Sequence, residues 1–211
     1  MSPEEIKAYF TRNDRTFTFA RWGRPIAPIV FGVEDETLSL LKGAIEAVTE
    51  LATHSLSETD PELGSNLMVF FFQDWKELCD VPKLDQIVPE LGSLTLKLEK
   101  AQANQYRFFR FDEAGGIKAC FSFIRMDEHL NAVSGEALCL SQTVQSILLW
   151  SDVAFQNVSP LALLPSGETI LRPEIGKLIR AAYDPTLAVY SDQPSHCLLY
   201  TSPSPRDYTR S

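Results

Sequence analysis

The sequence of 211 residues lacks the signatures of the commonest site chemistries. It has only three histidines and four cysteines, and neither H-E-x-x-H nor C-x-x-C occurs. The phosphate-binding patterns G-x-G-x-x-G and G-x-x-x-x-G-K-[ST] are also missing, so a dedicated nucleotide site has no support. We therefore expect no resident cofactor and no metal site.

Long apolar runs and basic clusters are missing too. No run approaches the roughly 20 apolar residues of a membrane-spanning helix, so we expect none. A formal net charge of −9 repels phosphate backbones and argues against a nucleic-acid partner. The first ten residues have no basic start followed by an apolar core, which predicts a cytoplasmic protein. The cell envelope is the alternative if an export leader is missing.

The last residues differ in character from the rest. Serines and prolines gather in Ser202-Pro203-Ser204-Pro205, and no helical or strand period is present. The string from Cys197 to Asp207 resembles translated sequencing-adapter read-through. We expect residues 191–211 to form a disordered tail that is foreign to the natural protein, and we assign it no function.

The rest of the chain has the periodicities of one globular α+β domain. Acids at residues 34–36 open a helix that runs to Leu51, and the fully apolar run Leu67–Phe72 predicts a strand buried on both faces. The other expected elements are an interrupted strand at 16–31, a short helix at 74–78, a helical stretch at 84–100 broken near Pro89 and Gly92, hairpin strands at 106–111 and 117–126, and helices at 136–149 and 173–183. We predict a small mixed sheet of about four strands packed with several helices. It would form a single domain over residues 16–190, after an N-terminal extension at 1–15.

The helix that begins at Glu136 carries amides and hydroxyls where a zinc peptidase carries histidines. Its inward polar positions include Ser141, Gln142 and Gln145, none of which ligates zinc strongly or acts as a base near neutral pH. With Trp150 and Asp152 at the end of the stretch, these residues are our candidate cleft for binding. We assign no catalytic residue.

The order strand, long helix, apolar strand, hairpin, helix resembles that of the smallest zincin (zinc-metallopeptidase-like) domains. Residues 140–152, 171–178 and the ending Ala182-Tyr183-Asp184-Pro185 look like an uncharacterised proteobacterial family of putative lipoproteins with a degenerate zincin-like fold. Arg21-Trp22 and Asn66 are further similarities. The resemblance implies a zincin-like architecture without the zinc motif, and it implies no metal ligands.

The strand 106–111 alternates aromatic and arginine residues. One face presents Tyr106, Phe108 and Arg110, and the other presents Arg107, Phe109 and Phe111. The first three are our candidate interaction residues for an extended partner or an anionic ligand. The alternative is a core strand whose arginine stems lie along apolar neighbours.

Other reactive side chains have structural explanations. We interpret His129 as part of a solvated turn at a strand end, and His54 as a helix C-cap whose positive form the helix dipole favours. Cys120 and Cys139 lie in apolar contexts without a nearby base, which predicts buried, inert thiols.

Besides an assembly subunit that uses the Tyr106 to Phe111 edge, two functional hypotheses follow. The first is a non-catalytic module that binds a protein or peptide partner on a degenerate metallopeptidase-like scaffold. The alternative is a hydrolase with an unrecognised acid/base site, for instance Glu136, Asp152 or the cluster Asp127-Glu128-His129 brought together by folding.

Overall fold

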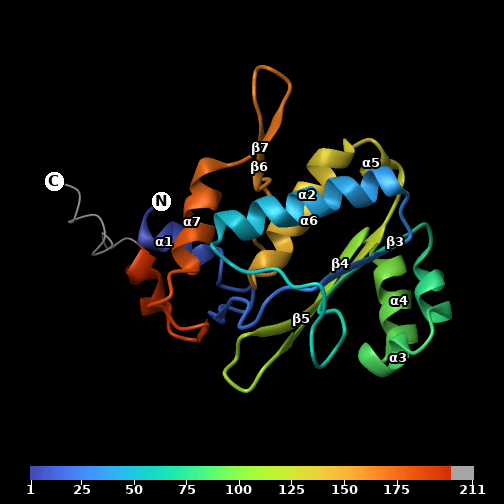
Figure 1. Cartoon of the computed structure of the whole chain (residues 1–211), viewed down its shortest axis with the longest axis horizontal. Helices are drawn as coiled ribbons and strands as arrows, with labels where there is room; N and C mark the ends of the chain where they lie inside the picture. Colours follow the sequence, from blue (N-terminus) through green and yellow to red (C-terminus); the bar gives the residue numbers. More distant parts are fainter. Residues whose placement is uncertain (201–211) are drawn as a thin grey trace.

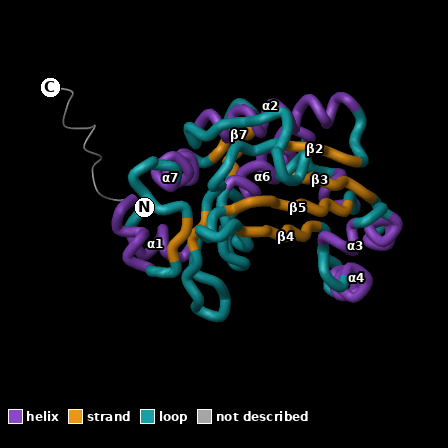
Figure 2. Tube along the Cα trace, turned by 60° about the horizontal axis from the view of Figure 1, so that its bottom comes forward, coloured by secondary structure: helices purple, strands orange, loops and turns teal. Residues whose placement is uncertain are grey.

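A four-stranded mixed sheet lies at the centre of the computed structural model, which describes residues 1–200, with side chains to residue 197. Figure 2 shows the strands in the order β2-β3-β5-β4. The strands β2 (Pro28–Phe31), β3 (Leu67–Phe72) and β5 (Ile117–Arg125) are parallel, whereas β4 (Gln105–Phe111) pairs antiparallel with β5. The predicted α+β class with a four-stranded mixed sheet is confirmed.

Helices cover both faces of this sheet (Figure 1). On one face lie α2 (Asp35–Leu51), α6 (Gly135–Ile147) and α7 (Pro173–Ala182), and they enclose the larger apolar core. On the other face lie the 3-10 helix η1 (Trp75–Asp80), α3 (Leu84–Ile87) and α4 (Leu91–Lys100) around a second core. All of β3 except half-buried Met68 is therefore buried, as its uninterrupted apolar sequence predicts.

The long helix α2 follows the sequence closely. Leu41, Ile45 and Val48 recur at three-to-four spacing and are all buried, so one stripe of the helix faces the sheet and α6. Asp35 and Glu36 occupy its first turn, where negative charge is favourable. The predicted break near Pro89 and Gly92 is also present, because α3 ends at Ile87 and α4 starts at Leu91.

Residues before 16 and after 190 belong to the ordered domain. The helix α1 (Pro3–Ala8) is capped by Ser2 and buries Ile6, and Phe10 has no exposed surface. The strand β1 (Phe19–Ala20) pairs with β8 (Tyr190–Ser191), which leads into the 3-10 helix η2 (Pro194–Tyr200) beside α1. The disorder expected from residue 191 is thus wrong for 191–197, since His196 and Cys197 are buried against the core. Residues 201–211 lie outside the described residues.

The chain leaves α6 earlier than expected and then forms a projecting hairpin. Leu148 has an extended backbone and bridges to Arg21, so the helix ends at Ile147 rather than at Leu149. The strands β6 (Leu161–Leu163) and β7 (Thr169–Leu171) form a hairpin that stands away from the body in Figure 1. The short helix α5 (Glu128–Asn131) precedes α6.

None of the helices within residues 1–200 combines the length and the apolar character that a membrane crossing requires. The expectation that no segment spans a membrane agrees with this finding for the part of the chain described.

Candidate functional site

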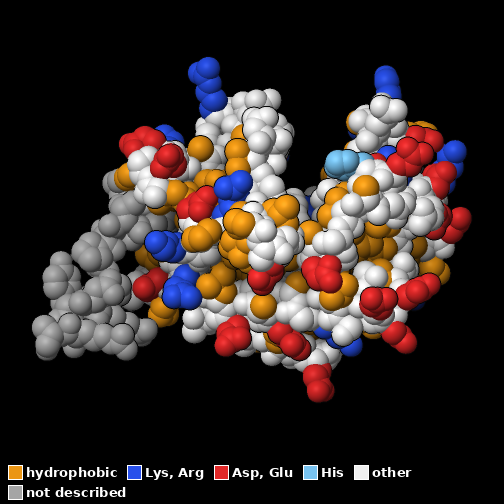
Figure 3. Space-filling model, turned by 90° about the horizontal axis from the view of Figure 1, so that it is seen from above, with side chains coloured by type: hydrophobic (Ala, Val, Ile, Leu, Met, Phe, Trp, Pro, Cys, Tyr) orange, Lys and Arg blue, Asp and Glu red, His pale blue; other side chains and the backbone are white. Residues whose placement is uncertain are grey.

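Two adjoining cavities lie along β4 and together form a groove, here called the β4 groove. Their volumes are about 690 and 920 Å³, and both are lined by Gln145, Ala154 and Phe155. The smaller cavity is lined by β4 residues from Arg107 onward and by residues 149–152, and the larger one by Asn104, Gln105, α6 and the hairpin β6–β7. The space-filling view in Figure 3 shows a surface hollowed between projecting parts, with hydrophobic side chains gathered near its centre.

The strand β4 is an edge of the sheet, because only β5 pairs with it among the described strands. The amide of Arg125 donates to the carbonyl of Asn104, and hydrogen-bonded positions alternate along an antiparallel ladder. The backbone N–H and C=O groups of residues 104, 106 and 108 therefore point toward β5. The backbone N–H and C=O groups of Gln105, Arg107 and Phe109 point to the free edge, where an extended chain can pair with them.

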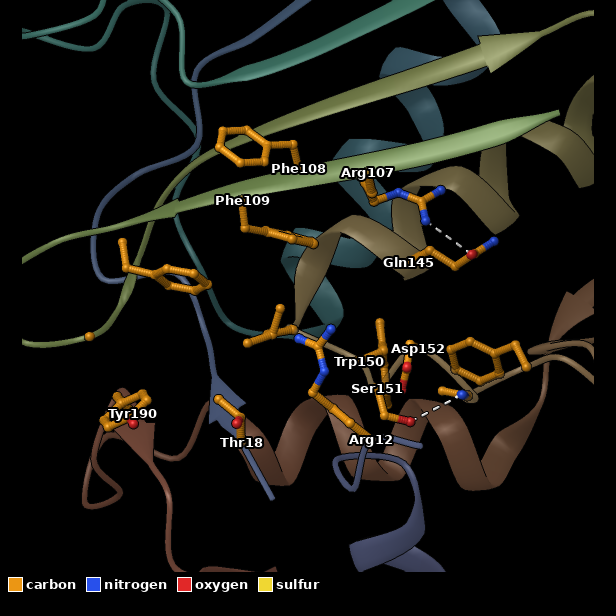
Figure 4. Close-up of a pocket in the computed structure, with 15 residues that line it drawn as sticks. Arg12, Thr18, Arg107, Phe108, Phe109, Gln145, Trp150, Ser151, Asp152 and Tyr190 are labelled. Atoms are coloured by element: carbon orange, nitrogen blue, oxygen red, sulfur yellow. Dashed lines mark hydrogen bonds between the residues drawn. The ribbon is translucent and has the colours of Figure 1, made fainter. Parts of the chain in front are cut away.

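Arg107 joins the edge strand to α6 (Figure 4). Its Nη2 donates to Gln142 Oε1 at 2.5 Å, and its Nη1 donates to Gln145 Oε1 at 3.1 Å. Gln142 and Gln145 are three residues apart, so they lie on the same face of the helix and meet the guanidinium together. The network continues at both ends, since Gln142 Nε2 donates to Gln105 Oε1 at 2.7 Å and Gln145 Nε2 to Ser141 Oγ at 3.0 Å.

The side chain of Arg107 is partly buried, its Nε is fully buried, and the residues that accept its hydrogen bonds are neutral. Burial lowers the pKa of Arg107, although an arginine side chain stays charged in a protein. None of the ion pairs found within residues 1–197 includes Arg107, and its Nε has no hydrogen-bond partner. The thiol of Cys120 lies near the Arg107 guanidinium. Burial raises the pKa of this thiol to about 12, so it is protonated and does not balance the charge of Arg107.

Trp150 forms a fixed aromatic wall of the smaller cavity. Its Nε1 donates to the carbonyl of Val144 at 2.8 Å, and its ring stacks on Phe10 with 5.6 Å between centroids. Tyr9 and Phe155 contact it edge-on, at 5.8 and 5.0 Å. The indole is therefore held from several sides while it remains partly exposed to the cavity.

The loop after Trp150 is tied to the N-terminal segment. Ser151 N donates to Tyr9 O at 2.8 Å, and the carboxylate of exposed Asp152 accepts a hydrogen bond from Asn13 N at 2.9 Å. Phe155, which lines both cavities, has a φ of +64°, a left-handed conformation that is unusual for a bulky residue. Such backbone strain is concentrated at functional sites.

All five residues of the predicted cleft line the groove. Gln145, Trp150 and Asp152 line the smaller cavity, and Ser141, Gln142 and Gln145 line the larger one. The sequence missed Arg107 as the centre of the site. Strand alternation places Arg107 on the face opposite Tyr106, but the alternation does not say which face receives α6, and a core strand with arginine stems along apolar neighbours is the alternative interpretation.

The candidate interaction residues lie on the other face of β4. Tyr106 stacks parallel to Phe123, and Phe108 packs against Phe121, both in the core beneath α4. Arg110 Nη2 donates to the carbonyl of Ile87 at 2.6 Å, at the end of α3. Tyr106 and Arg110 thus pack away from the groove, whereas Phe108 also touches the smaller cavity.

The acidic and imidazole groups of the alternative hydrolase site do not gather at one point. Asp127 accepts hydrogen bonds from Leu130 N and Asn104 Nδ2, which hold the pKa of its carboxyl below the usual value, backbone bonding being the larger cause. His129 is exposed on α5 and borders the larger cavity, and Asp152 lines the other. Within residues 1–197, no group of three or more His, Cys, Asp or Glu side chains could hold a metal ion.

His54 has a structural role, but its charge preference differs from expectation. Its Nε2 lies 2.8 Å from the carbonyl of Arg24, and its ring contacts Tyr183. Burial lowers its pKa and outweighs the hydrogen bond to Arg24, which raises it, so the neutral ring is favoured rather than the positive form that was expected. Cys120 and Cys139 are buried free thiols, as predicted.

The residues that carry the family resemblance fasten the end of α6. Trp22 Nε1 donates to the carbonyl of Ser146 at 2.9 Å, and the Tyr183 hydroxyl donates to that of Ile147 at 2.7 Å. Arg21 lies over the Tyr183 ring, and its Nη2 donates to Leu187 O. Asn66 is fully buried and bonds to Ala27, Pro25 and Asp60. Trp22 and Tyr183 thus fix the end of α6, whereas Asn66 ties the start of β3 to residues 25–27 and to Asp60.

No family model, no curated protein and no solved structure matches this chain.

Proposed function

We propose that the protein is a non-catalytic binding module that holds an extended polypeptide segment in the β4 groove. The observation that carries this proposal is the free edge of β4, which runs beside two connected cavities. An extended segment can add to such an edge through backbone hydrogen bonds, while pockets take alternate side chains and supply specificity.

The polar side chains of α6 support binding over catalysis. Gln142 and Gln145 use their amide oxygens to accept from Arg107 and their amide nitrogens to donate to neighbours. Neither an amide nor the Ser141 hydroxyl acts as a general base or a strong zinc ligand near neutral pH. The resemblance to degenerate zincin domains is part of this proposal, because it accounts for a peptide-binding cleft without peptidase chemistry.

A selection from a random-peptide display library against the immobilised protein tests the proposal. Enriched peptides, synthesised and added to ¹⁵N-labelled protein, are expected to shift the amide signals of Arg107 and Phe109, which face the free edge. The inward amides of Tyr106 and Phe108 are the internal control and should move less. Failure to enrich any peptide, or shifts confined to other surfaces, contradicts the proposal.

The hydrolase alternative would need an acid and a base in one pocket. Asp152 lines the smaller cavity, His129 on α5 borders the larger one, and Glu136 is exposed in the first turn of α6 outside both linings. Hydrolysis of an enriched peptide by the purified protein, lost on Asp152→Asn or His129→Gln substitution, would favour that alternative.

A further inference from the structure

We propose that Arg107 is a recognition site for a carboxylate of the ligand held in the β4 groove. This inference rests on the proposed function and specifies the chemistry of the bound segment. Its basis is a partly buried guanidinium, with a fully buried Nε, that no acid of the described chain neutralises.

The hydrogen bonds of Arg107 leave part of its donor capacity unused. A guanidinium has five N–H donors, and two of them are taken up by the amide oxygens of Gln142 and Gln145. The Nε proton is buried and has no partner. A buried positive charge is unfavourable unless an anion accompanies it, and amide oxygens compensate for it less well than a carboxylate does.

The location of Arg107 makes it available to a ligand. Arg107 lines the smaller cavity, its acceptor Gln142 lines the larger one, and its acceptor Gln145 lines both. The guanidinium therefore lies where the two cavities meet, on the side of β4 that Figure 4 shows facing the cavity and α6.

The side chains that line the groove carry a net positive charge, opposite in sign to the net charge of the whole chain. The smaller cavity is lined by Arg12 and Arg107 and by a single acid, Asp152. The larger cavity has no Asp or Glu in its lining, whereas the whole chain carries a formal net charge of −9. Arg12 is exposed and takes part in none of the ion pairs of residues 1–197. This local excess of cations favours an anionic ligand.

A carboxylate fits these groups better than a phosphate. The planar guanidinium matches two carboxylate oxygens, and a single negative charge balances a single buried cation. A dianion would add a second charge in a strongly acidic protein. The carboxylate can be the C-terminus of the bound segment or an Asp or Glu side chain within it.

Three matched tripeptides test the inference. The first is acetyl-Thr-Val-Phe with a free carboxylate, the second is the same peptide as its amide, and the third is acetyl-Thr-Glu-Phe amide. Binding is followed by amide shifts of Arg107 and Phe109 and by the change in tryptophan fluorescence, because Trp150 lines the smaller cavity whereas Trp22 and Trp75 are fully buried and line neither cavity. At least one of the two peptides that carry a carboxylate should bind at least about 10-fold more tightly than the neutral amide.

Variants of the two strand arginines separate the site from general charge effects. Arg107→Met should abolish the preference for the acidic peptides, whereas Arg110→Met, on the same strand but the opposite face, should preserve it. Preference for the first peptide alone identifies a terminal carboxylate, and preference for the third identifies a side-chain carboxylate. Competition by inorganic phosphate at equal concentration would instead favour a phosphate ligand and overturn the inference.

Equal binding of all three peptides would overturn the carboxylate site and leave the polypeptide groove intact. Unchanged preference in folded Arg107→Met protein would also overturn it. If none of the three binds at millimolar concentration, the inference fails, and the display selection decides the proposed function separately. Retention of the native near-ultraviolet circular dichroism shows that each variant is folded.

Discussion

Gln142 on α6 accepts a hydrogen bond of 2.5 Å from Arg107 on the edge strand β4, and this contact links the helix to the free edge of the sheet. The two residues differ in what their removal does. Loss of the arginine removes a buried charge, whereas loss of the amide leaves that charge with one acceptor fewer.

Arg107→Met is expected to leave the free energy of unfolding within about 1 kcal/mol of the wild-type value, or to raise it, because an apolar side chain carries no desolvation cost. Gln142→Leu is expected to lower it by about 2 kcal/mol, since a donor of the buried Arg107 guanidinium loses its acceptor. Urea denaturation measures both values. The double variant should be more stable than Gln142→Leu alone, and a double variant less stable than either single variant would contradict this account.

The pH dependence of stability should include a contribution from His54. Its pKa is lowered in the folded protein, mainly by burial, so the unfolded chain takes up a proton first as the pH falls. The contribution is complete above about pH 6.5 and declines as the pH falls from there toward the folded-state pKa.

Denaturation of wild type and His54→Gln at about pH 7.5 and about pH 5 tests this assignment. The wild-type protein should lose more stability between the two values than the variant. His196 also has a pKa lowered by burial, so it too reduces stability as the pH falls. The contribution of His54 is therefore the difference between the stability losses of the wild type and the variant. An identical loss in both would remove His54 from the explanation.

Phe10→Ala should destabilise the protein by about 3 to 5 kcal/mol, as expected for removal of a fully buried phenyl ring. The same change should alter Trp150 fluorescence, because the two rings stack. Phe111→Ala is the matched control, since this ring is 44% exposed and its removal should cost no more than about 0.5 kcal/mol. Equal stability of the two variants would show that the segment before residue 16 is dispensable.

Alkylation by iodoacetamide should distinguish exposed Cys79 from buried Cys120 and Cys139 in the native protein. Cys79 is exposed, whereas Cys120 and Cys139 are buried with pKa values raised to about 12 and about 11, both mainly by burial. Because the thiolate is the reactive form, Cys79 should be labelled first and the two buried thiols only on unfolding. Mass spectrometry of peptides from the labelled protein identifies the sites, and early labelling of Cys120 would contradict the described packing.

Long periodic elements were predictable from the sequence. The buried stripe of α2 and the apolar run of β3 both lie where their patterns predict them. The candidate cleft was also predictable in part, because Gln142 and Gln145 share a helix face by spacing alone.

The elements missed are those that depend on distant partners. The segment before residue 16 has no long period, and its Phe10 is buried between the nearby rings of Phe17 and Phe19 and that of Trp150, which lies far along the chain. The end of α6 is set by the bridge between Leu148 and Arg21, which no local signal announces.

The role of Arg107 was missed for a related reason. Alternation divides β4 into two faces, but the sequence does not say which face receives α6 and which receives α3 and α4. That choice decides whether Arg107 or Arg110 borders a cavity.

The pairing of β1 with β8 has a consequence for how the protein can be engineered. A strand near the start of the domain is completed by one near its end, so trimming either segment removes the partner of the other. New termini are better opened at the tip of the projecting β6–β7 hairpin, where the exposed turn Ser166-Gly167 makes few contacts with the body.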